Sequence, residues 1–278
     1  MSTKDDPPLG RWGHFAWIDP YFDEDSMLVF GGRYGEDYIN QSAFSDIWRF
    51  NLKTCRWSKL SDGISGRTIM VNNNGAVATG KGKMFFTNSN RPMVNVSLPT
   101  EIWLYEVQRN QFTLIPVSHS SFVPKQEWLF SVILLNSMMN KENDNFESLV
   151  VYGGWQQNEF YRFDLATGVF HNLSTAGSNI PPRSAGHLGI SVRDANHYPL
   201  YMIWSANNQP IFWFYSFTDD TWTSKIISSP PPRLYTQAVP ISNNGSISLL
   251  TSTVWFVVGG HDINSNRCLS DVWALGNF

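Results

Sequence analysis

The sequence has little charge and no long apolar run, and each shortage argues against a class of protein. Of its 278 residues only 15% are Asp, Glu, Lys or Arg, against about 25% in typical soluble domains, and the net charge is −3. No cluster of Lys and Arg stands out, so no nucleic-acid partner is expected. No apolar run reaches the ~18 residues that a transmembrane helix needs, so no membrane span is expected within this chain.

Cysteine and targeting signals are also scarce. The first ten residues, MSTKDDPPLG, have no apolar core and do not form a signal peptide. The two cysteines, Cys55 and Cys268, are far apart and belong to no C-x-x-C pair, which favours reduced thiols over a disulfide framework. We therefore expect a cytoplasmic protein, with an extracellular location left open.

Aromatic residues and turn formers are abundant. The chain contains 12 Trp, 10 Tyr and 19 Phe, together 15% of its residues, with 20 Gly and 15 Pro. Aromatic side chains favour the half-buried surface of a β-sheet, and no segment shows the period of 3.6 residues of an amphipathic helix. The composition therefore favours a fold of strands and turns.

The aromatic residues recur at fixed offsets. In four places an aromatic-x-aromatic pair is followed by a further aromatic residue, seven positions after its second member. The copies are Trp48-x-Phe50 with Trp57, Trp103-x-Tyr105 with Phe112, Tyr161-x-Phe163 with Phe170, and Trp213-x-Tyr215 with Trp222. A fifth copy begins at Trp273-x-Leu275, and its partner position lies beyond Phe278. Such periodicity indicates a repeat protein.

Each repeat divides into four short strands. A basic residue precedes each first strand, and the first strands are HFAWI (14–18), TIMV (68–71), WLFSVILL (128–135), AGHLGISV (185–192) and LYTQAV (234–239). The second strand is strongly apolar, the third carries the aromatic pair, and a tight turn leads to the fourth. Antiparallel sheets of this kind bury their faces when they stack radially, with the aromatic rings as wedges between them.

This pattern resembles the kelch repeat family, whose repeats read apolar run, Gly-Gly, aromatic, aromatic. The match is carried by VFGG (29–32), VYGG (151–154) and VVGG (257–260), whereas repeats two and four lack the glycine pair. The expected structural residues are Gly31, Gly32, Gly153, Gly154, Gly259, Gly260, Trp48, Trp57, Trp103, Tyr161, Trp213, Trp222 and Trp273.

The resemblance implies an all-β, kelch-type β-propeller over residues 11–278, after an N-terminal extension at 1–10. Five recognisable blades of four antiparallel strands would span about 11–62, 63–121, 122–178, 179–228 and 229–278. The last blade would lack its fourth strand. Two explanations stay open: a fragment of a longer propeller, or a five-bladed ring with a three-stranded last blade.

The sequence has no recognisable catalytic or metal-binding motif. Its six histidines show neither H-x₃-H nor H-E-x-x-H spacing, and none has an acidic residue four positions before it, as the iron site of plant specifier proteins requires. A G-x-S-x-G nucleophile motif is also missing. We therefore expect no catalytic residue, no metal and no cofactor, and predict that the protein is not an enzyme.

Binding is expected instead at the loops between second and third strands. From the second glycine position to the third-strand aromatic, these span 16, 15, 7, 7 and 13 residues in repeats one to five, and regular blades need only the short version. The candidate partner-binding residues are Arg33, Tyr34, Glu36, Asp37, Tyr38, Arg91, Trp155, Gln156, Asn207, Asn208, His261, Asp262 and Arg267.

These loops predict a non-catalytic protein–protein interaction module, a scaffold or adaptor that binds a protein partner at one mouth of the propeller. Two alternatives stay open. One is an enzyme or small-ligand-binding propeller with its site at the central channel. The other is the extracellular kelch region of a membrane protein.

Overall fold

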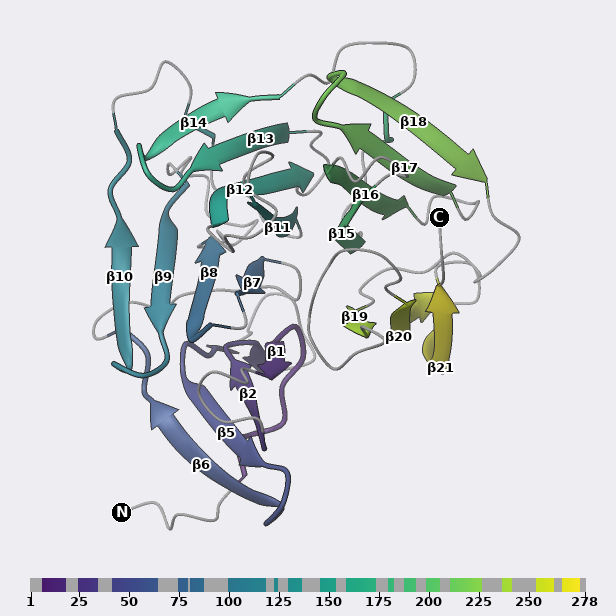
Figure 1. The fold of residues 1–278 in the computed structure, drawn as a ribbon. Helices are drawn as coiled ribbons and strands as arrows, with labels where there is room; N and C mark the ends of the chain where they lie inside the picture. The colour runs from purple at the N-terminus through teal and green to yellow at the C-terminus, as the bar shows by residue number, and fades with distance from the viewer. Residues whose placement is uncertain are drawn as a thin grey trace. The chain divides into compact units, whose positions relative to one another are not determined.

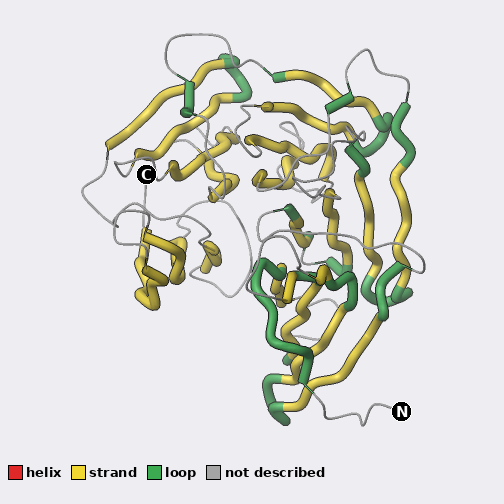
Figure 2. The backbone as a smooth tube through the Cα atoms, turned by 180° about the vertical axis from the view of Figure 1, so that it is seen from behind, coloured by secondary structure: helices red, strands yellow, loops and turns green. Residues whose placement is uncertain are grey.

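The computed structural model consists of β-strands joined by turns and loops, and its described residues contain no helix (Figures 1 and 2). It describes residues 7–18, 25–34, 42–64, 75–79, 81–87, 100–118, 123–124, 130–136, 146–153, 159–173, 180–182, 188–193, 199–205, 211–226, 237–241, 254–262 and 267–275. The chain forms two compact units. The first is Met1–His119 with Val123–Trp128, and the second is Ser120–Phe122 with Leu129–Phe278.

The first unit contains two four-stranded sheets and one small hairpin. Sheet 1 consists of β1 (Phe15–Ile18), β2 (Ser26–Phe30), β5 (Ile47–Asn51) and β6 (Arg56–Ser61), in that spatial order. Sheet 2 consists of β7 (Ala76–Ala78), β8 (Lys83–Thr87), β9 (Ile102–Glu106) and β10 (Gln111–Ile115). The small hairpin pairs β3 (Arg33–Tyr34) with β4 (Ser42–Ala43), between β2 and β5 in the chain.

The second unit contains three sheets. Sheet 3 consists of β11 (Phe130–Asn136), β12 (Phe146–Gly153), β13 (Glu159–Asp164) and β14 (Val169–Asn172). Sheet 4 consists of β15 (Leu188–Arg193), β16 (Pro199–Ser205), β17 (Ile211–Ser216) and β18 (Thr221–Ile226). Sheet 5 consists of β19 (Gln237–Ile241), β20 (Val254–Asp262) and β21 (Arg267–Leu275), and has no fourth strand among the described residues.

The first strand of sheet 2 differs from the expectation. The segment TIMV (68–71) lies outside the described residues, and the structure takes the first strand from Ala76–Ala78. This strand pairs with β8 through Val77 opposite Phe85. The prediction followed apolar β-branched residues, but the small residues of AVA, close to the turn before β8, supply the pairing strand.

The offset of seven residues has a simple geometric explanation. In each of the first four sheets, the second aromatic of the third strand lies directly opposite the aromatic of the fourth strand. These pairs are Phe50–Trp57, Tyr105–Phe112, Phe163–Phe170 and Tyr215–Trp222, with ring centroids 4.9, 4.7, 4.7 and 5.1 Å apart. Aromatic cross-strand pairs of this kind stabilise antiparallel sheets.

The four hairpin turns share one unusual backbone conformation. The residue five positions after the second aromatic is left-handed in every one: Cys55 at φ 54°, Asn110 at 50°, Gly168 at 70° and Asp220 at 52°. Gly, Asn and Asp tolerate this conformation better than other residues do. Three of the four turns therefore have a favourable residue at this position, and the first has a cysteine.

Side chains also fix these turns. The Oδ1 atom of Asn51 accepts hydrogen bonds from the backbone N–H groups of Lys53 and Thr54, at 3.1 and 2.8 Å. Asp164 does the same for Ala166 and Thr167, at 3.0 and 2.8 Å. Partial burial raises the pKa of Asp164, but the bonds from Thr167 and Ala166, with the charge of Arg162, outweigh it and lower the pKa.

Aromatic rings fill the space between neighbouring sheets within each unit. Phe30 of sheet 1 lies against Phe86 and Phe112 of sheet 2, at centroid distances of 4.9 and 6.0 Å. In the second unit, Tyr152 of sheet 3 lies 5.5 Å from Trp222 of sheet 4. The second-strand residue of one sheet therefore contacts the fourth-strand aromatic of the next in both units.

Candidate functional site

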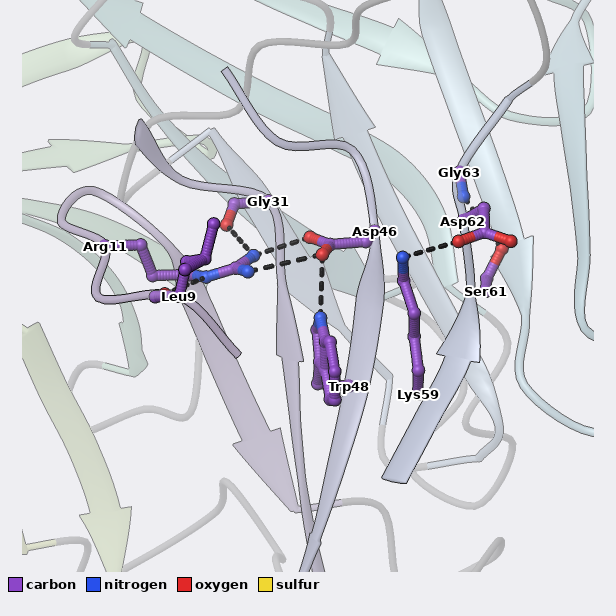
Figure 3. Close-up of polar contacts among 9 residues, drawn as sticks. All are labelled: Leu9, Arg11, Gly31, Asp46, Trp48, Lys59, Ser61, Asp62 and Gly63. Carbon is purple, nitrogen blue, oxygen red and sulfur yellow. Dashed lines mark hydrogen bonds and ion pairs between the residues drawn. The ribbon is translucent and has the colours of Figure 1, made fainter. Parts of the chain in front are cut away.

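An ion pair ties the N-terminal segment to the end of sheet 1 (Figure 3). The guanidinium of Arg11 donates to Asp46 Oδ1 at 2.5 Å and Oδ2 at 3.2 Å, and to the carbonyl oxygen of Gly31 at 2.9 Å. Trp48 Nε1 donates to the same carboxylate at 2.7 Å. The side chains of Arg11 and Asp46 are only 5% and 12% exposed, so this is a buried, fully bonded pair.

The glycine pair after β2 lets the chain pass close to this ion pair. Gly31 and Gly32 both have positive φ, at 66° and 95°. A Cβ atom on Gly32 would lie 3.0 Å from the Cβ of His14 and from the carbonyl oxygen of Trp12. A side chain at this position would therefore be both strained and crowded.

The described residues of the long loop of repeat one form the hairpin β3–β4. Trp12 and Arg33 exchange two backbone hydrogen bonds of 3.0 and 2.8 Å, so the N-terminal segment adds a further bridge to β3. Tyr34 follows on β3 and is 56% exposed. This places one predicted contact residue on a backbone that is held by pairing on both sides.

Arg33 occupies a different position from the one expected of a contact residue. It is 3% exposed, and its guanidinium carbon lies 5.7 Å from the centroid of the Trp12 ring. The interpretation of Arg33 as a surface residue is therefore corrected. Its side chain packs on the buried face of the hairpin, because successive side chains of β3 point to a buried and an exposed face in turn.

The long loop of repeat five is also a hairpin. His261, Asp262 and Arg267 lie on β20 and β21, and not in an open loop: His261 is opposite Cys268 and Asp262 is opposite Arg267. The register shifts between Val258 and Gly260, at the glycine pair. A bulge at the glycine pair changes the register, and the two strands then continue to pair as far as Asp262 and Arg267.

The remaining candidate contact residues lie outside the described residues, as does Gly154; they are Glu36, Asp37, Tyr38, Arg91, Trp155, Gln156, Asn207 and Asn208. Trp273 lies on β21, paired with Val257. Trp48, Trp103, Tyr161 and Trp222 are buried, whereas Trp57 and Trp213 are half-buried.

Two parts of the site were missed from the sequence. Leu9 and Trp12 are 65% and 39% exposed on the segment that precedes sheet 1, which was expected to be a mere extension up to residue 10. Asp46 was also overlooked. Its signal was present: an acidic residue stands two positions before the first aromatic in repeats one, two, three and five, as Asp46, Glu101, Glu159 and Asp271.

The described residues offer no group of three or more His, Cys, Asp and Glu side chains that could hold a metal ion. Among the described residues there is also no helix long and apolar enough to cross a bilayer. Burial raises the pKa of Tyr105 to about 12, and its hydroxyl donates to Asn110 Oδ1 at 2.8 Å.

Four-stranded antiparallel sheets with aromatic hairpins are the blades expected of a β-propeller, and comparisons with known proteins support this fold. A family model described as "Kelch motif" matches residues 23–63, which hold β2 to β6. The chain therefore has the fold of a kelch-type β-propeller, as its sequence predicted, and the kelch motif itself is matched over residues 23–63.

One solved structure that the chain resembles is entitled "Structure of YjhT", a kelch-type propeller. The likeness has a TM-score of 0.60 at 13% identity and covers 96% of this chain and 84% of that one. At this identity it establishes the fold alone. No curated protein sequence matches the chain.

Proposed function

We propose that this protein is a non-catalytic protein–protein interaction module of the cytoplasm, a scaffold or adaptor. It recognises a protein partner through the loops that join second and third strands at one mouth of the propeller. The observation that supports this most directly is the hairpin β3–β4, which presents Tyr34 at 56% exposure. Tyrosine is among the residues that dominate binding energy at protein interfaces.

The hairpin exceeds what sheet 1 needs. Repeats three and four join their second and third strands with 7 residues from the second glycine position to the aromatic, whereas repeat one uses 16. Of the additional residues, Arg33 and Tyr34 pair with Ser42 and Ala43, and the guanidinium of Arg33 lies over the Trp12 ring. A binding residue on an ordered strand loses less conformational entropy when a partner is bound.

Sheet 5 provides a second ordered hairpin of the same kind. The paired ends of β20 and β21 hold His261, Asp262 and Arg267 on opposite strands beyond the glycine pair. Among the described residues, the long connections of repeats one and five thus have strand structure that the propeller blade itself does not use. Both support recognition by preformed loops on a rigid scaffold.

The test is site-specific photo-crosslinking in the cell of origin. A photoreactive phenylalanine replaces Tyr34 in one variant and Leu52 in a second; Leu52 is 45% exposed in the β5–β6 turn, at the other end of sheet 1. Position 34 should capture one discrete protein and position 52 should not. Equal capture at both positions contradicts the proposal.

The captured partner then allows a quantitative measurement. Tyr34→Ala should weaken its affinity about tenfold or more, which is the effect of losing a central aromatic contact. Leu52→Ala should leave the affinity unchanged. The non-catalytic part is tested by metal analysis of the purified protein, where a stoichiometric transition metal would contradict it and favour a central-channel enzyme.

A further inference from the structure

His14 lies where the N-terminal segment crosses the glycine pair of sheet 1. It is half-buried, and its Cβ would touch any Cβ placed on Gly32. The residues around it are bonded across the two segments: Trp12 to Arg33 through the backbone, and Arg11 to Gly31 and Asp46 through the guanidinium. His14 therefore lies within the contact that holds residues 7–14 to β3.

Three ionised groups are described at this contact, two arginines and one aspartate. Arg11 lies on the same segment as His14, and Arg33 lies on β3, with both residues largely buried. The one carboxylate described here is Asp46, and Arg11 and Trp48 already occupy both of its oxygens. Tyr34 on β3 is exposed. A proton on half-buried His14 would therefore add a second positive charge beside Arg11, whose partner carboxylate is already bonded.

We infer that the contact between residues 7–14 and β3 is an acid-sensitive latch, which opens when His14 is protonated. Burial, and secondly the positive charge of Arg11, lower the pKa of His14 below its usual value, while a backbone hydrogen bond at Arg11 acts in the opposite direction. The closed latch thus resists protonation, whereas His14 in an opened segment takes up a proton near pH 6.5.

The sign of the effect follows from proton linkage. Well above pH 6.5 His14 is neutral in both states, so it contributes no pH dependence there. Below pH 6.5 the open state binds the proton and the closed state does not, so the closed state loses stability until the pH falls below the lowered pKa. The latch therefore weakens in the mildly acidic range, by up to about tenfold in its opening constant per pH unit.

Hydrogen exchange of two amides reports the latch directly, because Trp12 N–H and Arg33 N–H form its backbone bonds. After correction for intrinsic exchange, their opening constants should rise about four- to eightfold between pH 7.0 and 5.5. The Leu173 amide, bonded to the Phe160 carbonyl in sheet 3, should change less than twofold. This measurement uses the free protein and needs no partner.

Two variants and one titration complete the test. His14→Asn should make the rise at Trp12 and Arg33 less than twofold, whereas His171→Asn, at an exposed position of β14, should keep it. In the unmodified protein, NMR titration of His14 should give a pKa below 6.5, which decides the question even if the variant folds poorly. A pKa at or above 6.5, or an undiminished rise in His14→Asn, overturns the inference.

Discussion

Trp48 in sheet 1 and Trp213 in sheet 4 occupy the same position of the repeat in different surroundings. Trp48 Nε1 donates to Asp46, which also binds Arg11. In sheet 4 the position of Asp46 is taken by Ile211, and Trp213 Nε1 is buried with no acceptor among the described residues. Both hairpins nevertheless form with the same register of aromatic residues.

The difference shows that the aromatic pair and the acidic residue of the repeat stabilise different parts of the structure. The aromatic pair is sufficient to form the hairpin, because sheet 4 keeps it without the acid. In repeat one the acid also serves the glycine turn, because Asp46 binds the Arg11 that holds the carbonyl of Gly31. Repeat four has neither the acid nor the glycine pair, with Ser205 and Ala206 in place of the glycines. The polar network therefore secures the turn and the hairpin β3–β4 beyond it.

The contribution of the aromatic pair can be tested at Trp222, where the largest loss is expected. This ring is 6% exposed and contacts Tyr152, Phe160 and Tyr215 at 5.5, 5.1 and 5.1 Å. Trp222→Ala should lower the free energy of unfolding by about 3–5 kcal/mol. Trp57→Ala, at the half-buried equivalent in sheet 1, should cost clearly less. Urea denaturation followed by tryptophan fluorescence measures both, and equal losses would contradict the assignment.

The contribution of the acidic residue can be tested at Asp46. Asp46→Ala leaves the guanidinium of Arg11 buried without its carboxylate, and should cost about 3 kcal/mol. Asp62→Ala is the matched control, since Asp62 pairs with Lys59 at 90% exposure and should change stability by less than about 1 kcal/mol. If Asp46→Ala proved as mild as Asp62→Ala, the ion pair would not hold the turn.

The sequence made the sheets predictable because their main determinants are local. The hairpin register depends on an aromatic offset that can be read from the sequence. The pairing positions of Trp103 and Tyr105 in sheet 2 follow from this offset. The turn residue Asn110 also follows from local backbone geometry. The turn keeps its left-handed residue even at Cys55, which is not one of the residue types that favour this conformation.

The site was less predictable because it depends on pairing between distant segments. Burial of Arg33 requires Trp12, which lies 21 residues earlier in the chain, and no local pattern indicates their bridge. The hairpin of His261 and Asp262 requires a bulge at Gly259–Gly260, which in the sequence has the same appearance as an ordinary glycine turn. Loop length was visible, but the conformation of the loop was not.

The comparison is sharpened by one substitution made at both tryptophans. Trp48→Phe and Trp213→Phe remove the same atoms, but only Trp48 loses a hydrogen bond to a carboxylate. Trp48→Phe should therefore cost about 1.5–2 kcal/mol more than Trp213→Phe, which removes a buried N–H that has no acceptor among the described residues. Equal costs in the same urea experiment would show that the Asp46 bond contributes nothing net.

The smallest expected effect concerns the turn where sheet 1 departs from sheet 3. Cys55 and Gly168 occupy the same left-handed position, at φ 54° and 70°. Cys55→Gly relieves a steric cost of about 1–2 kcal/mol but increases the entropy of the unfolded chain, so it should stabilise the protein by about 0.5 kcal/mol. Gly168→Ala should destabilise it by about 1 kcal/mol, because alanine adds a Cβ at positive φ. Stability changes of opposite sign for Cys55→Gly and Gly168→Ala would establish that backbone conformation determines the residue at this turn position. A loss of stability in both variants would show instead that the Cys55 side chain has a packing role in the turn of sheet 1.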